Sequence, residues 1–334
     1  MCIGFCLLIN SIIYAQPSIQ LIDSSQKTSY RGLSVVDNNI IWVSGSNGTV
    51  GKSINGGKSW QWMHPKGYEK RDFRDIEAFD KNTAIIMAVA EPGIILKTKD
   101  GGKTWRKVFE DTTKGVFLDA IAFAGKYGYA IGDPIDQHLY LLKTNDLGEH
   151  WYRLKKDSKI FAANEAFFAS SGANIVAGRK KLKNKILLVS GGSSSRLFSI
   201  PSLQIQELPI MMGGGSRGAN AIALSPNEEK GMIVGGDFSI DTITEANSIQ
   251  LVFKKGHIDF KSTATNPHGY KSSVTYISDK KMISCGTSGV DISDDGGINW
   301  ELVSKESYHV VQRAKKGNAV YLAGSKGKIA KLIL

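Results

Sequence analysis

One motif occurs four times in the chain, as Ser53-Ile-Asn-Gly-Gly-Lys-Ser-Trp60, Thr98-Lys-Asp-Gly-Gly-Lys-Thr-Trp105, Thr144-Asn-Asp-Leu-Gly-Glu-His-Trp151 and Ser293-Asp-Asp-Gly-Gly-Ile-Asn-Trp300. The shared pattern is [ST]-x-[DN]-x-G-x-x-W, the Asp-box. Its Asn or Asp can accept N–H hydrogen bonds across a tight turn, and its shared glycine can take a positive φ. The Trp can cover the turn and pack on a neighbouring strand. Each copy therefore predicts a β-hairpin.

The spacing of the copies gives the number of repeats. The Trp of the second copy follows that of the first by 45 residues, the third follows by 46, and the fourth by 149, which is about three intervals. Two repeats have therefore lost the motif, and we expect their last strands near Arg196–Ile200 and Gln250–Phe253. A period of 40–50 residues with strand-rich units is typical of a β-propeller.

Each repeat also has the same arrangement of apolar segments before its hairpin. In the second repeat we expect strands at Asp75–Phe79, Thr83–Ala90 and Gly93–Thr98, followed by Trp105–Phe109. No long stretch has helical periodicity. The fold class is therefore all-β, with four-stranded blades.

The two ends of the chain complement each other. A last repeat has strands at His309–Arg313, Ala319–Ala323 and Lys328–Leu334 but no fourth strand, whereas Ser18–Asp23 is an extra strand before the first repeat. Pairing them would close the ring and remove two free edges. We therefore expect seven blades, with six or eight as the alternatives.

Residues 1–15 are uncharged and mostly apolar, and too short to span a bilayer. They resemble the apolar region of a secretory signal cleaved after Ala15, although no Lys or Arg precedes it; the alternative is a buried first strand. We therefore expect a secreted or periplasmic protein whose residues 16–334 form a single propeller domain. Only Cys285 would remain, inside an apolar segment, as a buried thiol. No other segment reaches the length of a membrane span.

The composition is that of a folded, basic protein. Apolar residues make up 42% and charged residues 22%, which excludes a disordered chain, and the net charge is +11. The densest basic run, Arg179–Lys185, is expected in the loop between the second and third strands of blade four. It forms either a solvated turn or a surface for acidic glycans, lipid head groups or an acidic protein. Nucleic acid is not an expected partner, because the aromatic residues occupy repeat positions and do not alternate with the lysines.

The motifs resemble those of a known family. The Asp-box is found in bacterial neuraminidases, and its combination with Gly-Ser-Asn-Gly-Thr is similar to the Ycf48-type photosystem II stability and assembly factors and to related exported bacterial proteins. The matching stretches are Trp42–Trp60, Asp72–Asp75, Glu91–Trp105, Gly132–Pro134, Asn164–Ala169, Gly235–Asp237 and Gly269–Tyr276. The resemblance implies the propeller fold and leaves the function open.

In a propeller, the loops that lead into the innermost strands and the loops between second and third strands share one face, here called the funnel face. The Asp-box hairpins lie on the opposite face and are expected to be structural. Charged residues among such apolar strands either bind a ligand or form ion pairs between blades, such as Arg31 or Arg74 with Asp75 or Asp119. The candidate ligand-binding residues are Arg31, Arg74, Asp75, Asp119, Asn164, Glu165, Arg217, Tyr270 and Lys271.

A carbohydrate-active enzyme, a glycosidase or sialidase-like protein, is the alternative. Glycoside hydrolysis needs two carboxyl groups, and the candidate catalytic residues are Glu91, Asp133, Glu165, Asp237 and Tyr270. Sialidases use a Tyr–Glu pair and several arginines, but their Arg-Ile-Pro segment is missing, and they usually have six blades.

Neither CxxC nor HExxH occurs, so we expect no metal and no cofactor. The leading hypothesis is a monomeric, exported, non-catalytic scaffold that binds a protein or a glycan on its funnel face.

Overall fold

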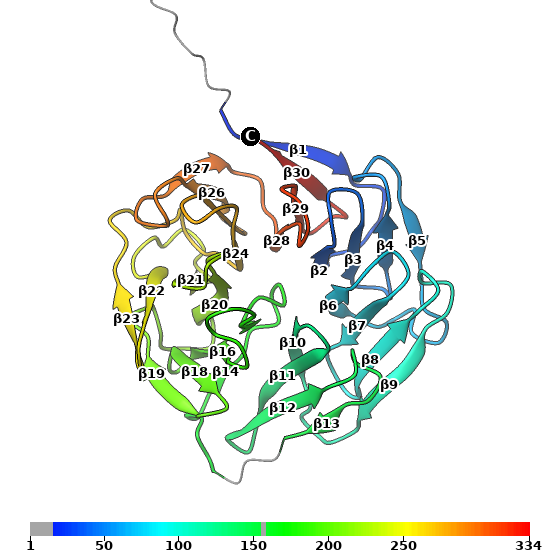
Figure 1. Cartoon of the computed structure of the whole chain (residues 1–334), viewed down its shortest axis with the longest axis horizontal. Helices are drawn as coiled ribbons and strands as arrows, with labels where there is room; N and C mark the ends of the chain where they lie inside the picture. The colour runs from blue at the N-terminus through cyan, green and yellow to red at the C-terminus, as the bar shows by residue number, and fades with distance from the viewer. Residues whose placement is uncertain (1–15, 155–157) are drawn as a thin grey trace, which may run out of the picture.

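The computed structural model describes residues 16–154 and 158–334, and within these ranges the chain forms strands and turns without a helix. Seven antiparallel sheets surround a central axis (Figure 1). The predicted seven-bladed propeller is confirmed, whereas the predicted signal at residues 1–15 lies outside the described residues. No helix in these two ranges has the length and hydropathy to cross a membrane.

The strands of the blades, from the axis outward, have the following bounds. Blade one comprises β2 (Tyr30–Val35), β3 (Ile41–Gly45), β4 (Val50–Ser53) and β5 (Gln61–Met63); blade two comprises β6 (Phe73–Ala78), β7 (Ala84–Ala88), β8 (Gly93–Thr98) and β9 (Arg106–Asp111); blade three comprises β10 (Leu118–Ala124), β11 (Tyr127–Ile135), β12 (His138–Thr144) and β13 (Tyr152–Arg153). Blade four comprises β15 (Ile175–Ala177), β16 (Ile186–Val189), β18 (Arg196–Ile200) and β19 (Gln204–Glu207); blade five comprises β20 (Arg217–Leu224), β21 (Lys230–Asp237), β22 (Ser248–Lys254) and β23 (His257–Lys261). Blade six comprises β24 (Ser273–Tyr276), β25 (Met282–Gly286), β26 (Gly289–Ser293) and β27 (Glu301–Ser304), and blade seven comprises β28 (Val310–Arg313), β29 (Val320–Ala323), β30 (Ile329–Ile333) and β1 (Ser18–Asp23). Two short strands, β14 (Glu165–Ala166) and β17 (Gly191–Gly192), extend the sheet of blade five at its inner edge.

The ring closes as predicted. Strand β1 pairs antiparallel with β30, with Ser18 opposite Ile333 and Leu21 opposite Ala330. Ile19 packs on the apolar core that blades six and seven share, and Ile22 packs on the core between blades seven and one. Strand β1, near the start of the described residues, is thus the outermost strand of the last blade.

Each Asp-box folds through its own side chains. The Ser or Thr hydroxyl accepts a hydrogen bond from the N–H of the shared glycine at 2.8–3.0 Å in all four copies. The Asn or Asp accepts one from the residue four positions later at 2.9–3.1 Å. The shared glycine has a φ of 77–89° in every copy, a conformation that side chains disfavour. The predicted structural role is therefore confirmed.

Each Asp-box also joins two blades. The carbonyl of its fourth residue accepts a hydrogen bond from a side chain of the preceding blade. The pairs are Tyr321 to Gly56 (3.2 Å), Lys52 to Gly101 (2.8 Å), Lys97 to Leu147 (2.6 Å) and Gln250 to Gly296 (2.5 Å). The recurring hairpin is therefore a clamp between neighbouring blades.

Three details of blades four and five differ from expectation. Arg196–Ile200 and Gln250–Phe253 belong to third strands, β18 and β22, and the fourth strands β19 and β23 follow them. The basic run Arg179–Lys185 connects the first and second strands of blade four. It therefore lies on the face of the Asp-box hairpins, not on the funnel face. The short strands β14 and β17 caused the error, because they pair with blade five instead of contributing to blade four.

Apolar side chains fill the spaces between blades. Between blades one and two, for example, Trp42, Phe73 and Ile86 belong to one buried cluster. Cys285 is a fully buried free thiol in a similar cluster between blades six and seven, which confirms its predicted structural role.

Candidate functional site

The central channel contains a segment of the chain itself. This segment is the stretch after β14, residues 167–174, which Figure 1 shows as green chain inside the ring of blades. The Ser171 hydroxyl donates to the carbonyl of Ser272 at 2.6 Å, and the Ser170 hydroxyl donates to Asn220 at 3.1 Å. A side chain at Gly172 would collide with the carboxyl group of Asp75. This segment, here called the plug, therefore contacts blades two, five and six.

A pocket of about 390 Å³ lies on the funnel face, beside the plug. The residues that line it come from six of the seven blades and the plug, and aromatic side chains predominate. They are Arg31, Arg74, Phe117, Phe167, Phe168, Ala169, Ser170, Phe238, Tyr270, Ser272, Thr287 and His309. Of the predicted ligand-binding residues, the structure brings Arg31, Arg74 and Tyr270 together here.

The two arginines differ in their partners. Arg74 donates to Asp72 at 2.8 Å and lies over the ring of Phe117. Arg31 makes one hydrogen bond, to the carbonyl of Ser170 at 3.2 Å, and pairs with no carboxylate among the described residues. Burial and the charge of Arg74 lower the pKa of Arg31, which indicates a positive site that would gain from an anion.

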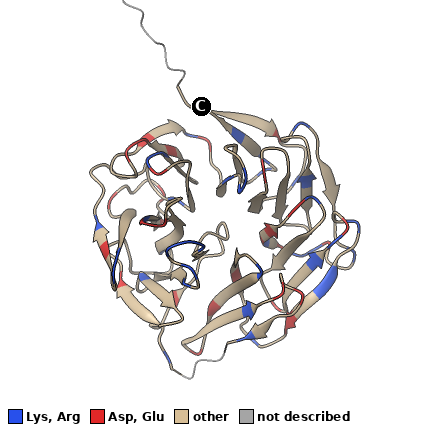
Figure 2. Ribbon diagram, viewed as in Figure 1, with Lys and Arg blue, Asp and Glu red and all other residues tan. Residues whose placement is uncertain are grey.

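The other polar groups of the pocket are uncharged at neutral pH. Burial raises the pKa of Tyr270 to about 12, and its hydroxyl donates to Asn220 at 2.8 Å. Burial, Arg31 and other cations lower the pKa of His309 to about 3. No carboxylate lines the pocket among the described residues. Figure 2 shows acidic and basic residues spread over the whole ring. The lack of a carboxylate is therefore a feature of this pocket and not of the whole ring.

Phe238 forms the exposed part of the wall. Its side chain is 47% exposed and meets Phe168 and Tyr270 edge-on, with ring centroids 5.9 and 6.2 Å away. Exposed aromatic rings in such an arrangement provide apolar contact area at little entropic cost. The pocket thus combines an aromatic wall with one arginine that lacks an anionic partner.

The remaining predicted ligand-binding residues lie elsewhere. Asp75 is buried and accepts N–H bonds from Ile76 and Ile121, both at 2.7 Å. Asn164 is an exposed turn residue with a φ of 61°. The predicted pairs of Arg31 or Arg74 with Asp75 or Asp119 are not formed, because Arg74 pairs with Asp72 and backbone N–H groups satisfy Asp75.

Three further predicted residues belong to structural ion pairs. Glu165 is buried against Arg196, whose Nε donates to it at 2.9 Å. Arg217 pairs with Asp237 at 2.9 Å, at the edge of blade five. Lys271 is fully buried and pairs with Asp291 at 2.7 Å. These contacts hold strands and loops together, and each of the three charges has an oppositely charged partner within the chain.

The candidate catalytic carboxylates do not meet in an open site. None of Glu91, Asp133, Glu165 and Asp237 lines the central pocket. Although its surroundings partly desolvate it, hydrogen bonds from Arg217 and Ser216 lower the pKa of Asp237 to about 2. Tyr270 hydrogen-bonds to Asn220 and Ser170 rather than to a glutamate. Among the described residues, the central pocket therefore contains neither the carboxyl pair of a glycosidase nor the Tyr–Glu pair of a sialidase.

Asp119, in the innermost strand of blade three, has a buried carboxyl group. It is fully buried, neither carboxyl oxygen has a hydrogen-bond partner among the described residues, and burial and Asp133 raise its pKa well above the usual value. The folded state therefore holds a proton that the unfolded chain releases, so this group lowers stability as the pH rises above about 4.

We expect Asp119→Asn to raise the melting temperature at pH 8 and to change it little at pH 4, as thermal unfolding at both pH values would measure. An equal effect at the two pH values would contradict a buried, protonated Asp119.

Sequence reasoning missed the aromatic residues and the plug. Phe238 directly follows the Gly-Gly-Asp segment, whereas Phe117 lies two residues before Asp119 and Phe168 lies three residues after Glu165. An unpaired aromatic residue in a loop of the funnel face was the available signal. Ser170 carried no signal, because only the path of the plug brings it into the pocket.

The chain is similar to known proteins in both sequence and fold. The family model "Photosynthesis system II assembly factor YCF48" matches residues 70–175, and that of the BNR/Asp-box repeat matches residues 291–302. The photosystem II stability/assembly factor HCF136 of Arabidopsis thaliana is 39% identical over 70 residues, which are 20% of this chain and 16% of that protein.

Two solved structures have the same fold. A structure titled "YCF48 bound to D1 peptide" covers 97% of this chain and is itself covered to 97%, with a TM-score of 0.68 and 15% identity. YCF48 from Cyanidioschyzon merolae covers 94% of this chain and is covered to 98%, with a TM-score of 0.65 and 15% identity. These findings confirm the resemblance to Ycf48-like Asp-box propellers that the motifs predicted.

Proposed function

We propose that this protein is an exported, non-catalytic propeller that binds a segment of a partner protein in its central pocket. Arg31 carries the proposal, because its guanidinium lies in an aromatic pocket without a carboxylate partner among the described residues. A carboxylate of the partner would form a charge-assisted hydrogen bond there, while apolar side chains of the same segment would contact Phe168 and Phe238.

The size of the pocket favours a peptide segment over a large ligand. A volume of about 390 Å³ holds a few side chains or a chain end. The structurally similar YCF48 was solved with a D1 peptide bound, which supports a protein ligand for this fold. Export is part of the proposal and rests on the apolar residues 1–15; N-terminal sequencing of the protein recovered from the periplasm or the medium tests whether it begins at Gln16.

A peptide array tests the proposal, with each peptide present both as a free C-terminal acid and as an amide. We expect peptides with an aromatic residue and a free carboxylate to bind, and Arg31→Gln to weaken them about tenfold, the usual loss for a hydrogen bond to a charged group. Arg106→Gln, on the outer strand β9, is the matched control and should bind like the unaltered protein.

Two results would contradict this function. Equal binding by the Arg31→Gln and unaltered proteins would show that Arg31 does not bind the carboxylate of the peptide. If glycans bound on an array in a manner that depends on Arg31, and no peptide bound, the pocket would be assigned to a carbohydrate instead.

A further inference from the structure

Among the described residues, the Asp-box clamp is absent at three of the seven interfaces, where blades four, five and seven follow the preceding blade, and one of these lies between blades three and four. Blades one, two, three and six each place an Asp-box hairpin on the preceding blade. Blade four has no Asp-box, and only residues 201–203 connect β18 to β19. The space that a hairpin would fill between blades three and four is therefore left open.

Blade three nevertheless retains the residues that receive a hairpin. The strand register pairs Trp42 with Lys52 in blade one, Ile85 with Lys97 in blade two, and Tyr129 with Lys143 in blade three. In the first two blades the lysine donates to the carbonyl of the next Asp-box at 2.8 and 2.6 Å.

The first member of each pair supports the same hairpin. Gly102 lies against Trp42, and Gly148 lies against the end of Ile85. Tyr129 and Lys143 thus form a receiving surface whose hairpin is missing. The ammonium group of Lys143 lies 5.8 Å from the ring centre of Tyr129 and makes no hydrogen bond or ion pair with a described residue.

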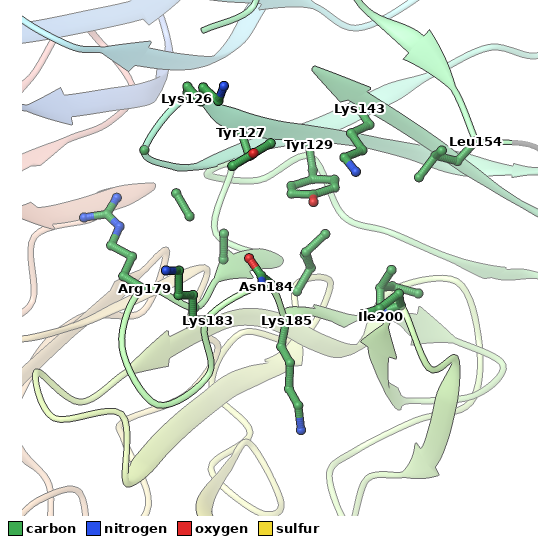
Figure 3. A pocket seen from close by; sticks show the side chains of 16 residues that line it. Lys126, Tyr127, Tyr129, Lys143, Leu154, Arg179, Lys183, Asn184, Lys185 and Ile200 are labelled. Atoms are coloured by element: carbon green, nitrogen blue, oxygen red, sulfur yellow. The ribbon is translucent and has the colours of Figure 1, made fainter. Parts of the chain in front are cut away.

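A cavity of about 680 Å³ occupies this position. Figure 3 shows Tyr127, Tyr129 and Lys143 on one wall, from blade three, and Arg179, Lys183 and Asn184 on the loop that faces them. Lys185 points away from the cavity in this view. We call this cavity the blade 3–4 slot.

The slot is positively charged. No Asp or Glu lines it among the described residues, and Lys126, Lys143 and Lys183 form no ion pair with a residue that the structure describes. The equivalent interface between blades two and three shows what such lysines accept. There, Glu149 of the hairpin pairs with Lys97 at 2.6 Å and with Lys99 at 2.7 Å.

The structure assigns to the blade 3–4 slot a second binding site, for an acidic turn of a partner protein that takes the place of the missing hairpin. A backbone carbonyl of the turn would accept from Lys143, an apolar side chain would pack on Tyr129 and Leu154, and a carboxylate would pair with Lys126 or Lys183. The slot lies on the face opposite to the central pocket, so the two sites can be occupied together.

The probe is a fluorescent cyclic peptide with the blade-three hairpin sequence Thr-Asn-Asp-Leu-Gly-Glu-His-Trp, followed by fluorescence anisotropy with the full propeller. We expect saturable binding that falls with added salt and weakens at least about tenfold in Lys143→Met, a typical loss for a hydrogen bond to a charged group. Lys280→Met, in an exposed turn of blade six, is the control and should not change binding. A peptide with Gln in place of Glu should bind more weakly.

A second variant tests the slot while keeping Tyr129 and Lys143 in place. Replacing Pro201–Leu203 by the seven-residue loop Asn-Asp-Leu-Gly-Glu-His-Trp would supply a hairpin from within the chain, and we expect it to abolish peptide binding and to raise the melting temperature. Absence of saturable binding to the unaltered protein, or equal binding by Lys143→Met, would overturn the proposal. So would binding to vesicles of phosphatidylcholine and phosphatidylglycerol that depends on Lys143 without peptide binding, since it would assign the slot to lipid head groups.

Discussion

A chain that begins at Ser24, and therefore lacks strand β1, unfolds roughly 5–10 °C below a chain that begins at Gln16. The deletion removes the pairing of β1 with β30 and the contacts of Ile19 and Ile22 with two interblade cores. Each of these half-buried side chains contributes about 1–1.5 kcal/mol, roughly half of what full burial gives, and a large domain loses about 2–4 °C per kcal/mol. Differential scanning calorimetry of the two chains measures the difference.

The same deletion exposes β30 as a free edge, so the shortened chain should also aggregate more readily. A synthetic peptide of residues 16–25 is the control, because it can pair with β30 without a covalent link and should restore part of the lost stability. Equal melting temperatures for the two chains would show that the pairing of β1 with β30 does not stabilise the ring.

The fold could be predicted because its signals are local. In each Asp-box, the side chains of residues such as Thr98 and Asp100 bond to backbone N–H groups within four positions, so the turn is encoded in eight consecutive residues. The spacing of the turns then determined the number of blades. Where the Asp-box was missing, in blades four and five, the strands were found but their order within the blade was wrong.

The site could be predicted only in part because its geometry depends on distant segments. Arg31 meets Ser170, which is 139 positions away, through the path of the plug. Lys271 and Glu165 carry charges that suggested binding, but Asp291 and Arg196 neutralise them. A single sequence reveals which charges exist, whereas the folded chain decides which of them have partners. Lys143 of the blade 3–4 slot, which has no polar partner among the described residues, was equally hidden, since its register equivalence to Lys52 and Lys97 appears only in the paired strands.

Replacing Lys271 by Met should lower the free energy of unfolding by about 3–5 kcal/mol, the usual cost of leaving one member of a buried ion pair alone. Both side chains are essentially inaccessible to solvent, at 0% for Lys271 and 1% for Asp291. Lys271 also donates to the carbonyl of His268 at 2.6 Å and to Ser288 at 2.9 Å, so it organises the loop that leads into blade six. Urea denaturation of the variant and the unaltered protein measures the loss.

The double variant Lys271→Met/Asp291→Leu separates the charge from the packing. Because it removes both buried charges and keeps apolar volume in their place, it should regain most of the stability that the single variant loses. Peptide binding in the central pocket should be unchanged in the double variant, since Lys271 does not line that pocket. A double variant as unstable as Lys271→Met would show that the hydrogen bonds of Lys271 to the loop, rather than its pairing with Asp291, hold this part of blade six. If a stable double variant lost peptide binding, Lys271 would have the ligand-binding role that the sequence analysis predicted for it.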